Sequence, residues 1–141
     1  MAKIAVVYWS GTGNTEAMAQ AVADGGKEAG AEVDMITPAA FSSDKVGEYD
    51  AIGFGCPSMG VEVLEEEEFE PMFNSIKGKL AEKAVALFGS YGWGDGEWMR
   101  NWEADCKAND ITLANESIIC NEAPEADTVE ALKAMGAKIV Q

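Results

Sequence analysis

The sequence contains no histidine, only three cysteines and only four prolines among its 141 residues. The absence of histidine removes the commonest general base and metal ligand of proteins. Cys56, Cys106 and Cys120 are widely spaced and form no C-x-x-C pair, so neither a zinc site nor a set of disulfides is expected. We expect reduced thiols in or near the core and no bound metal.

Basic residues are also scarce. Ten lysines and arginines stand against 25 aspartates and glutamates, which gives a net charge of -15. Such a surface repels nucleic acids and anionic membranes and attracts basic proteins. No apolar run approaches the roughly 20 residues of a membrane span, and no signal-peptide pattern precedes the first apolar run. We therefore expect a cytoplasmic protein whose partners are basic proteins.

Short apolar runs alternate with segments of helical spacing along one domain, residues 1–141. The runs at residues 4–8, 33–36, 51–55, 84–88 and 117–120 read as strands. Helices are expected at 14–30, around 69–76, after an N-cap at Asp95, and at 129–139, with a weak helix within 37–50. This alternation predicts an α/β fold in which helices cover both faces of a parallel sheet. The pair Gly25-Gly26 inside the first helix has no explanation in the sequence.

A glycine- and hydroxyl-rich turn, Ser10-Gly11-Thr12-Gly13-Asn14-Thr15, lies between the first strand and the first helix. Such a turn offers backbone N–H groups and the positive end of a helix dipole to an anion. A nucleoside triphosphate loop would need Lys-Ser where Asn14-Thr15 stands, and a dinucleotide loop would need glycine in place of Glu16. The turn therefore suits a terminal phosphate on a small cofactor, with an unliganded polar turn as the alternative.

Two large apolar side chains lie in later loops at the carboxyl ends of strands, where ligands bind in open parallel sheets. Met59 follows the third strand and Trp93 follows the fourth. A flat heteroaromatic ring could stack between them. Together with the phosphate turn, these two side chains predict a phosphorylated ring cofactor, although each alone is more typical of core packing.

Three motifs, in this order along the chain, resemble the flavodoxins and specifically the short-chain clostridial type. They are Tyr-Trp-Ser-Gly-Thr-Gly-Asn-Thr-Glu at 8–16, Gly-Cys-Pro-Ser-Met-Gly at 55–60, and Leu-Phe-Gly-Ser-Tyr-Gly-Trp-Gly-Asp-Gly at 87–96. The resemblance implies a flavodoxin-like three-layer sandwich with a five-stranded parallel sheet in the order 2-1-3-4-5. It also implies a monomer that holds one noncovalent FMN and carries electrons without catalysing a reaction of its own.

The resemblance also implies the residues that bind FMN. The phosphate would contact residues 10–15 and Ser90, and the ring would lie between Met59 and Trp93. Glu62 would accept a hydrogen bond from the N3–H group of the flavin. The full expected set is Ser10, Gly11, Thr12, Gly13, Asn14, Thr15, Pro57, Ser58, Met59, Gly60, Val61, Glu62, Gly89, Ser90, Tyr91, Gly92, Trp93, Gly94 and Asn121. Cys56 is interpreted as a packing residue. The run Glu65 to Glu68 is interpreted as a solvated face.

The expected function is a low-potential electron carrier that shuttles single electrons between basic redox enzymes through the semiquinone/hydroquinone couple. The resemblance implies a peptide flip within Met59 to Glu62 on the first reduction. Acidic residues, Glu122 among them, are expected at the rim of the pocket and would oppose the second reduction. The alternative is a small FMN-dependent NAD(P)H or quinone reductase on the same fold.

Overall fold

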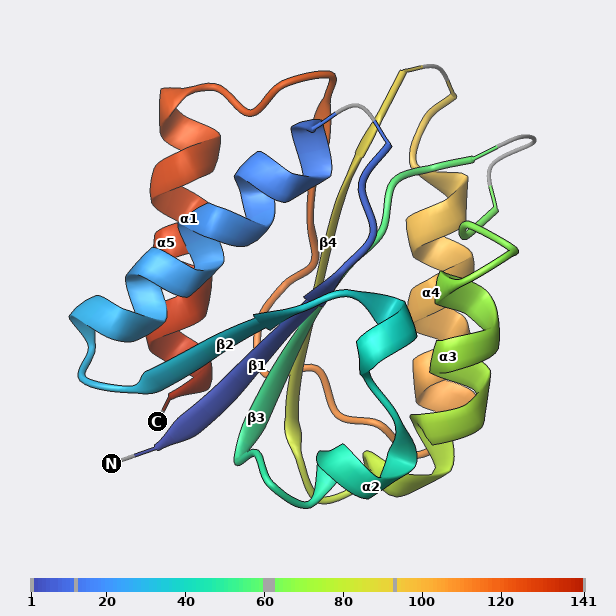
Figure 1. Cartoon of the computed structure of the whole chain (residues 1–141). Coiled ribbons are helices and arrows are strands. Elements are labelled where there is room, and N and C mark those ends of the chain that lie inside the picture. Colours follow the sequence, from blue (N-terminus) through green and yellow to red (C-terminus); the bar gives the residue numbers. More distant parts are fainter. Residues whose placement is uncertain (1, 12, 60–62, 93, 141) are drawn as a thin grey trace.

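A five-stranded parallel sheet forms the middle layer of the computed structural model, which describes residues 2–11, 13–59, 63–92 and 94–140 (Figure 1). Its strands are β1 (Lys3–Tyr8), β2 (Glu32–Ile36), β3 (Ala51–Gly55), β4 (Ala84–Tyr91) and β5 (Ile118–Asn121). They pair in the order β2-β1-β3-β4-β5, and every neighbouring pair is parallel. The predicted fold class and strand order are confirmed.

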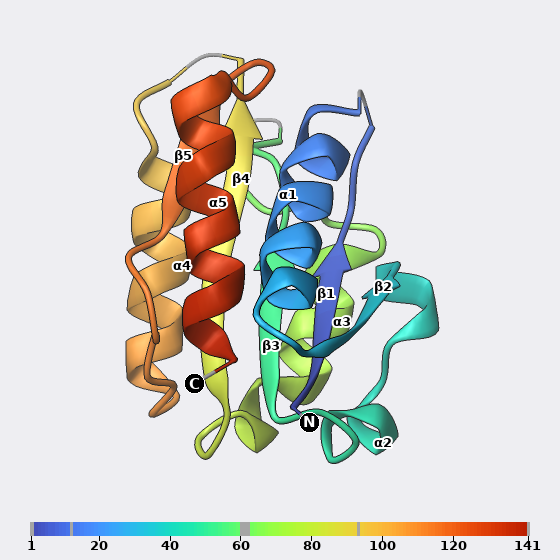
Figure 2. The ribbon, with the colours of Figure 1, turned by 90° about the vertical axis from the view of Figure 1, so that its left-hand side faces the viewer.

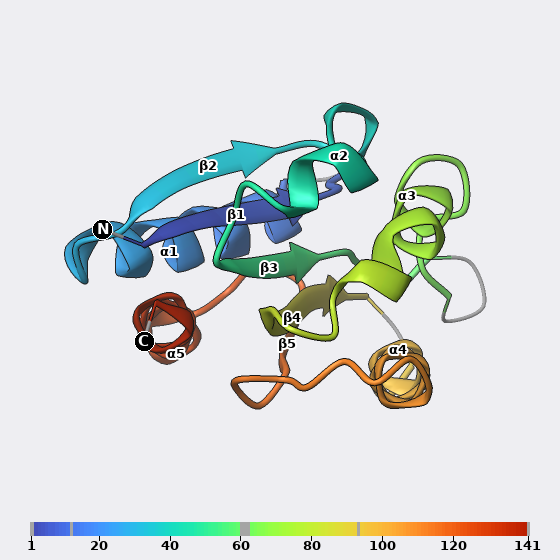
Figure 3. The same cartoon turned by 90° about the horizontal axis from the view of Figure 1, so that it is seen from below.

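Two layers of helices cover the sheet (Figures 2 and 3). One face carries α1 (Asn14–Glu28) and α5 (Ala126–Ile139), and the other carries α2 (Ser43–Val46), α3 (Phe69–Ile76) and α4 (Glu97–Ala108). Alternate residues of β1 face opposite layers: Ile4 and Val6 pack with α1 and α5, whereas Ala5 and Val7 pack with α3 and α4. No helix among the described residues is both long and apolar enough to cross a membrane.

The start of α4 differs from the sequence prediction. Its N-cap is Gly96, in the left-handed conformation with φ 95°. Arg100 donates to the backbone carbonyl of Asp95 at 3.0 Å and to its carboxylate at 2.9 Å. The N-cap residue is therefore Gly96 and not Asp95 as predicted, but the Asp95 carboxylate still accepts the backbone N–H of Glu97 at the start of the helix.

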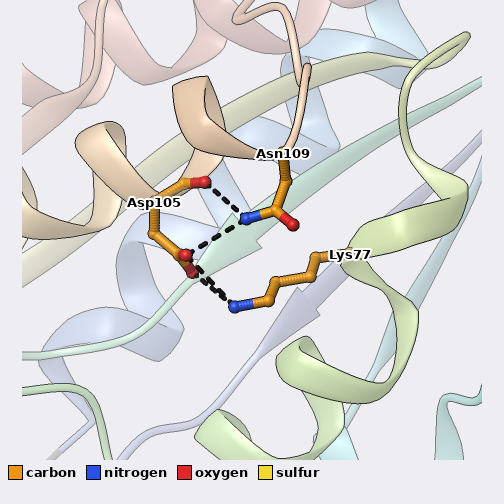
Figure 4. Close-up of polar contacts among 3 residues, drawn as sticks. All are labelled: Lys77, Asp105 and Asn109. Atoms are coloured by element: carbon orange, nitrogen blue, oxygen red, sulfur yellow. Dashed lines mark hydrogen bonds and ion pairs between the residues drawn. The ribbon is translucent and has the colours of Figure 1, made fainter.

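The α3 and α4 layer is joined to the sheet by aromatic side chains. Phe73 meets Phe54 edge to face at 5.2 Å between ring centroids, and Phe69 meets Trp102 at 5.4 Å. A polar cluster joins the C-terminal ends of α3 and α4, which lie far from the carboxyl ends of the strands (Figures 1 and 4). There Lys77 contacts both carboxylate oxygens of Asp105 at 3.1 Å, and the Asn109 amide donates to the Asp105 carbonyl at 2.8 Å.

Close packing of α1 against α5 and against the sheet explains the glycine pair in the first helix. A Cβ at Gly25 would lie 2.0 Å from the carbonyl oxygen of Lys133, and one at Gly26 would lie 2.6 Å from the Ile4 side chain. On the opposing helix, a Cβ at Gly136 would lie 2.0 Å from the carbonyl oxygen of Val22. At Gly25 and Gly136 the two helix backbones approach too closely for any side chain, whereas at Gly26 a side chain would meet Ile4 of the sheet.

Gly136→Ala should therefore destabilise the protein, although alanine favours a helix by about 1 kcal/mol over glycine. The added methyl group meets rigid backbone, so we expect a net loss of about 1–3 kcal/mol in the free energy of unfolding. Urea denaturation measures it. The control is Gly47→Ala, where φ is -66° and no atom lies within 4 Å, and it should be neutral or slightly stabilising. Equal stability of the two variants would contradict this account.

Candidate functional site

Backbone hydrogen bonds hold the segments that follow β1 and β3 against the carboxyl ends of the neighbouring strands, β3 and β4. Trp9 donates to the Gly55 carbonyl at 3.0 Å, and Cys56 donates to the Phe88 carbonyl at 3.1 Å. One residue pair further on, Ser58 donates to the carbonyl of Ser90 at 3.0 Å. The three loops predicted to form the site therefore lie side by side at one edge of the sheet.

The predicted phosphate turn leads directly into α1. Gly13 is the N-cap residue with φ 94°, and no side chain caps the helix. The Gly13 N–H instead donates to Oγ of Ser10 at 3.0 Å, which closes the turn. The N–H groups of the first helical turn and the positive end of the helix dipole are thus available to an anion. Thr12 lies outside the described residues.

A buried pair of hydroxyl groups connects this turn to the end of β4. Oγ1 of Thr15 and Oγ of Ser90 are 3.2 Å apart, and the two residues are only 1% and 5% exposed. Both belong to the predicted set of phosphate donors, and they are 75 positions apart in the sequence. The fold brings the two hydroxyl groups together at the site.

A cavity of about 220 Å³ lies among the predicted loops. The residues that line it come from the phosphate turn and from the loops after β3, β4 and β5. They are Trp9, Gly11, Asn14, Pro57, Ser58, Met59, Ser90, Tyr91, Gly92 and Glu122. The cavity thus runs from the predicted phosphate position to Met59, the predicted ring contact.

A second cavity, of about 430 Å³, lies on the other side of Trp9. It is lined by Tyr8, Trp9, Ser10, Gly11, Gly13, Glu16, Thr37, Pro38 and Glu68. Trp9 and Gly11 line both cavities, and the indole N–H of Trp9 donates to Oε1 of Glu68 at 3.1 Å. This larger cavity includes part of the phosphate turn and none of the residues expected near the ring.

The loop after β3 forms a hairpin closed by Met59 and Val63. Met59 donates to the Val63 carbonyl at 2.8 Å, and Val63 donates back at 3.0 Å. Gly60, Val61 and Glu62, which follow Met59 in the sequence, lie outside the described residues, as does Trp93. The predicted flip of the turn and the predicted stacking on Trp93 therefore stay predictions.

Cys56 packs beneath this hairpin. The side chain is fully buried, and Sγ accepts the Glu65 N–H at 3.3 Å and donates to the Pro57 carbonyl at 3.5 Å. Burial raises the pKa of the Cys56 thiol, so it stays protonated. The interpretation of Cys56 as a packing residue is confirmed, and all three cysteines are free thiols.

Glu65 departs from the interpretation of the glutamate run as a solvated face. It is 6% exposed, and its carboxylate accepts the backbone N–H groups of Glu67, Glu68 and Phe69 at 2.8, 2.7 and 2.7 Å. Burial opposes its ionisation, but the three N–H groups outweigh burial and lower the pKa of Glu65. The other three glutamates are exposed, so the interpretation holds for them and is wrong for Glu65.

Several predicted residues support the cavities without lining them. Gly89 lies in β4, where a Cβ would be 2.2 Å from the Cys56 carbonyl oxygen. Asn121 donates to the carbonyls of Tyr91 and Gly92 at 3.2 and 3.5 Å, and so orders the loop after β4. Gly94 has φ 91° in that same loop.

Trp9 and Glu122 line the smaller cavity but are missing from the predicted set of FMN-binding residues, although Glu122 is among the acidic residues expected at the rim of the pocket. Glu122 has φ 61°, an uncommon backbone conformation for a residue other than glycine, and its N–H donates to the Tyr91 carbonyl at 2.9 Å. No motif identifies Glu122, although its place directly after the last strand is a positional signal. In the sequence, the position of Trp9 at the end of the first strand is typical of a packing residue. Its contact with Glu68 joins segments that are 59 positions apart, so the sequence gives no sign of it.

The fold and the site define a class of protein: a doubly wound α/β domain with a glycine-rich turn and a cavity at the carboxyl ends of its strands. The model of the flavodoxin family matches residues 6–139. Flavodoxin from Clostridium beijerinckii is 46% identical over 123 residues, covering 86% of this chain and 89% of its own. Flavodoxin from Megasphaera elsdenii is 45% identical over 122 residues, covering 86% and 88%.

The chain belongs to the flavodoxin family. The solution structure of the two-electron reduced Megasphaera elsdenii flavodoxin superposes with a TM-score of 0.88 at 43% identity, covering 96% of this chain and 98% of the other. Flavodoxins are electron-transfer proteins that bind FMN. The predictions of FMN as the cofactor, and of an electron carrier in place of an enzyme, are confirmed.

The buried Glu65 carboxylate predicts a pH dependence of stability. A lowered pKa in the folded state stabilises the protein above the unfolded-state pKa of about 4.3, and this contribution is lost as the pH falls through the folded-state pKa. In urea denaturation, Glu65→Gln should cost about 1–3 kcal/mol at pH 7 and less at pH 3. The matched variant Glu66→Gln should cost little at either pH. If the loss of unfolding free energy in Glu65→Gln is larger at pH 3 than at pH 7, the lowered pKa of Glu65 is contradicted.

Proposed function

We propose that this flavodoxin is a low-potential, one-electron carrier whose FMN occupies the smaller cavity. The observation that carries the proposal is that this cavity extends from Gly11 and Asn14, at the phosphate turn, to Met59 and Tyr91. The residues along it suit one ligand with an anionic end and an apolar ring. FMN supplies a ring system that takes up and releases electrons one at a time.

The phosphate is assigned to the turn and the helix end beneath it. Ser10, Gly11, Thr12, Gly13, Asn14 and Thr15 would supply hydroxyl, amide and backbone donors, together with Ser90 from β4. The chemistry of this donor set fits a phosphate because every group donates hydrogen bonds and the helix dipole points the same way. The phosphate charge is left uncompensated by any lysine or arginine in the turn.

The ring is assigned to the loops after β3 and β4. Pro57, Ser58 and Met59, which line the cavity, would contact one side of the ring, with Gly60, Val61 and Glu62 beyond them. Residues 89–94 would supply the opposite side and its polar edge, with Asn121 ordering that loop. Met59 and Trp93 would exclude water from the two faces of the ring.

Charge supports a low potential for the second electron. Each added electron makes the bound cofactor more negative in a protein of net charge -15, beside an unneutralised phosphate and next to Glu122, which lines the cavity. Like charges at short range disfavour the more reduced form. The same excess of acid would steer basic redox enzymes toward the protein and favours a monomer in the cytoplasm.

An anaerobic reductive titration tests the carrier against the alternative reductase. We expect the flavin absorbance to change in two resolved one-electron steps, and we expect almost no oxidation of NADPH without an added reductase. Steady NADPH turnover, together with a single two-electron step, would favour the reductase and overturn the proposal. The protein as purified with FMN is used for both measurements.

The phosphate assignment predicts a selective loss in Thr15→Val. This change keeps the shape of the side chain but removes a hydroxyl group, and a hydrogen bond to a charged group contributes about 1.5–3 kcal/mol. FMN binding should weaken about tenfold or more, whereas riboflavin, which lacks the phosphate, should bind within about twofold of the wild type. Fluorescence titration of the apoprotein measures both affinities.

Thr112→Val is the matched control, because Thr112 is exposed and lies beside Leu113, which pairs with Val85 at the opposite end of β4. It should alter neither affinity. Equal weakening of FMN and riboflavin by Thr15→Val would place this hydroxyl away from the phosphate.

A further inference from the structure

The hairpin that carries Met59 has two supports. On the side that leads into it, Ser58 donates to the Ser90 carbonyl at 3.0 Å, which ties the chain to β4. On the side that leads out, the chain passes through Val63 and half-buried Leu64 to Glu65, four residues before α3 begins. The second support therefore depends on how Glu65 is held.

Glu65 is fixed at both its backbone and its side chain. Its N–H donates to Sγ of Cys56 at 3.3 Å, which ties it to the residue directly after β3. Its carboxylate accepts the N–H groups of Glu67, Glu68 and Phe69 at the start of α3. One residue thus connects the end of a central strand, the outgoing arm of the hairpin and the first turn of a helix.

These contacts reach further on both sides. The Cys56 carbonyl accepts the indole N–H of Trp98 from α4 at 3.1 Å. The carboxylate of Glu68, whose own N–H is held by Glu65, accepts the indole N–H of Trp9 beside the phosphate turn. The position of Glu65 is therefore coupled to both ends of the proposed FMN cavity.

We propose that Glu65 is a positioning residue for FMN, which sets the reduction potentials by fixing where the Met59 hairpin lies. The proposal rests on the proposed cofactor site. The Glu65 carboxylate is buried and accepts hydrogen bonds from three N–H groups, whereas the neighbouring residues Glu66 and Glu67 are exposed. Its chief effect on the flavin is therefore exerted through the backbone of the hairpin, and its negative charge is secondary.

Charge and position can be separated with three variants of the full-length, FMN-loaded protein. Glu65→Asp keeps the charge but is one methylene too short to reach the same N–H groups. Glu65→Gln loses the charge and places an amide N–H₂ among hydrogen-bond donors. Glu66→Gln loses one charge from an adjacent, exposed position and leaves the contacts of Glu65 intact.

The two one-electron potentials and the affinities for FMN and riboflavin are measured for each variant. We expect Glu65→Asp and Glu65→Gln to change the separation between the two potentials in the same direction. Both should weaken FMN and riboflavin about tenfold and equally, because the hairpin contacts the ring and not the phosphate. Glu66→Gln should leave both affinities within about twofold and raise both potentials slightly.

The opposite pattern would overturn the proposal. In that pattern, Glu65→Asp has the potentials and affinities of the wild type, and Glu65→Gln has those of Glu66→Gln. Only the charge of Glu65 would then matter. If neither Glu65 variant folds by circular dichroism, Cys56→Ala and Cys56→Ser test the same link. Alanine removes the acceptor of the Glu65 N–H and should shift the separation of the potentials, and serine should restore it. A wild-type separation in Cys56→Ala would contradict the proposal, whereas a wild-type protein that binds no FMN would refute the proposed function instead.

Discussion

The site depends on the parallel pairing of β1, β3 and β4, whose carboxyl ends meet at one edge of the sheet. Hydrogen bonding continues past the strands, from Trp9 to Gly55, from Cys56 to Phe88 and from Ser58 to Ser90. These bonds hold the segments after β1 and β3 in a fixed position relative to the end of β4. The phosphate turn, the ring cavity and the Met59 hairpin all rest on this edge.

Most of the fold could be predicted because its strands are buried on both faces and read as apolar runs between helical segments. What could not be predicted depends on contacts between distant elements. Gly25 and Gly26 look costly within an isolated helix, and they are explained only by the Lys133 backbone of α5 and the Ile4 side chain of β1 beside them. Asp95 reads as the N-cap of α4, whereas Gly96 takes that position and the Asp95 carboxylate binds both the Glu97 N–H and Arg100.

The candidate site could be predicted to a similar extent. The phosphate turn and Met59 come from local motifs, and the structure brings both to one cavity. Glu65 is hidden within a run of four glutamates, and nothing in that run indicates which side chain turns inward. The choice is made by Cys56 and by the three N–H groups at the start of α3. Buried acceptors of this kind are visible only once the backbone is placed.

The central claim is that FMN lies in the cavity between Trp9 and Met59, with its phosphate at the N-terminal end of α1. A crystal structure of the FMN complex tests it most directly. The account predicts phosphate oxygens within hydrogen-bond distance of residues 10–15 and a ring in contact with Met59. A cofactor on the other side of Trp9, against Thr37 and Pro38 in the larger cavity, would contradict it.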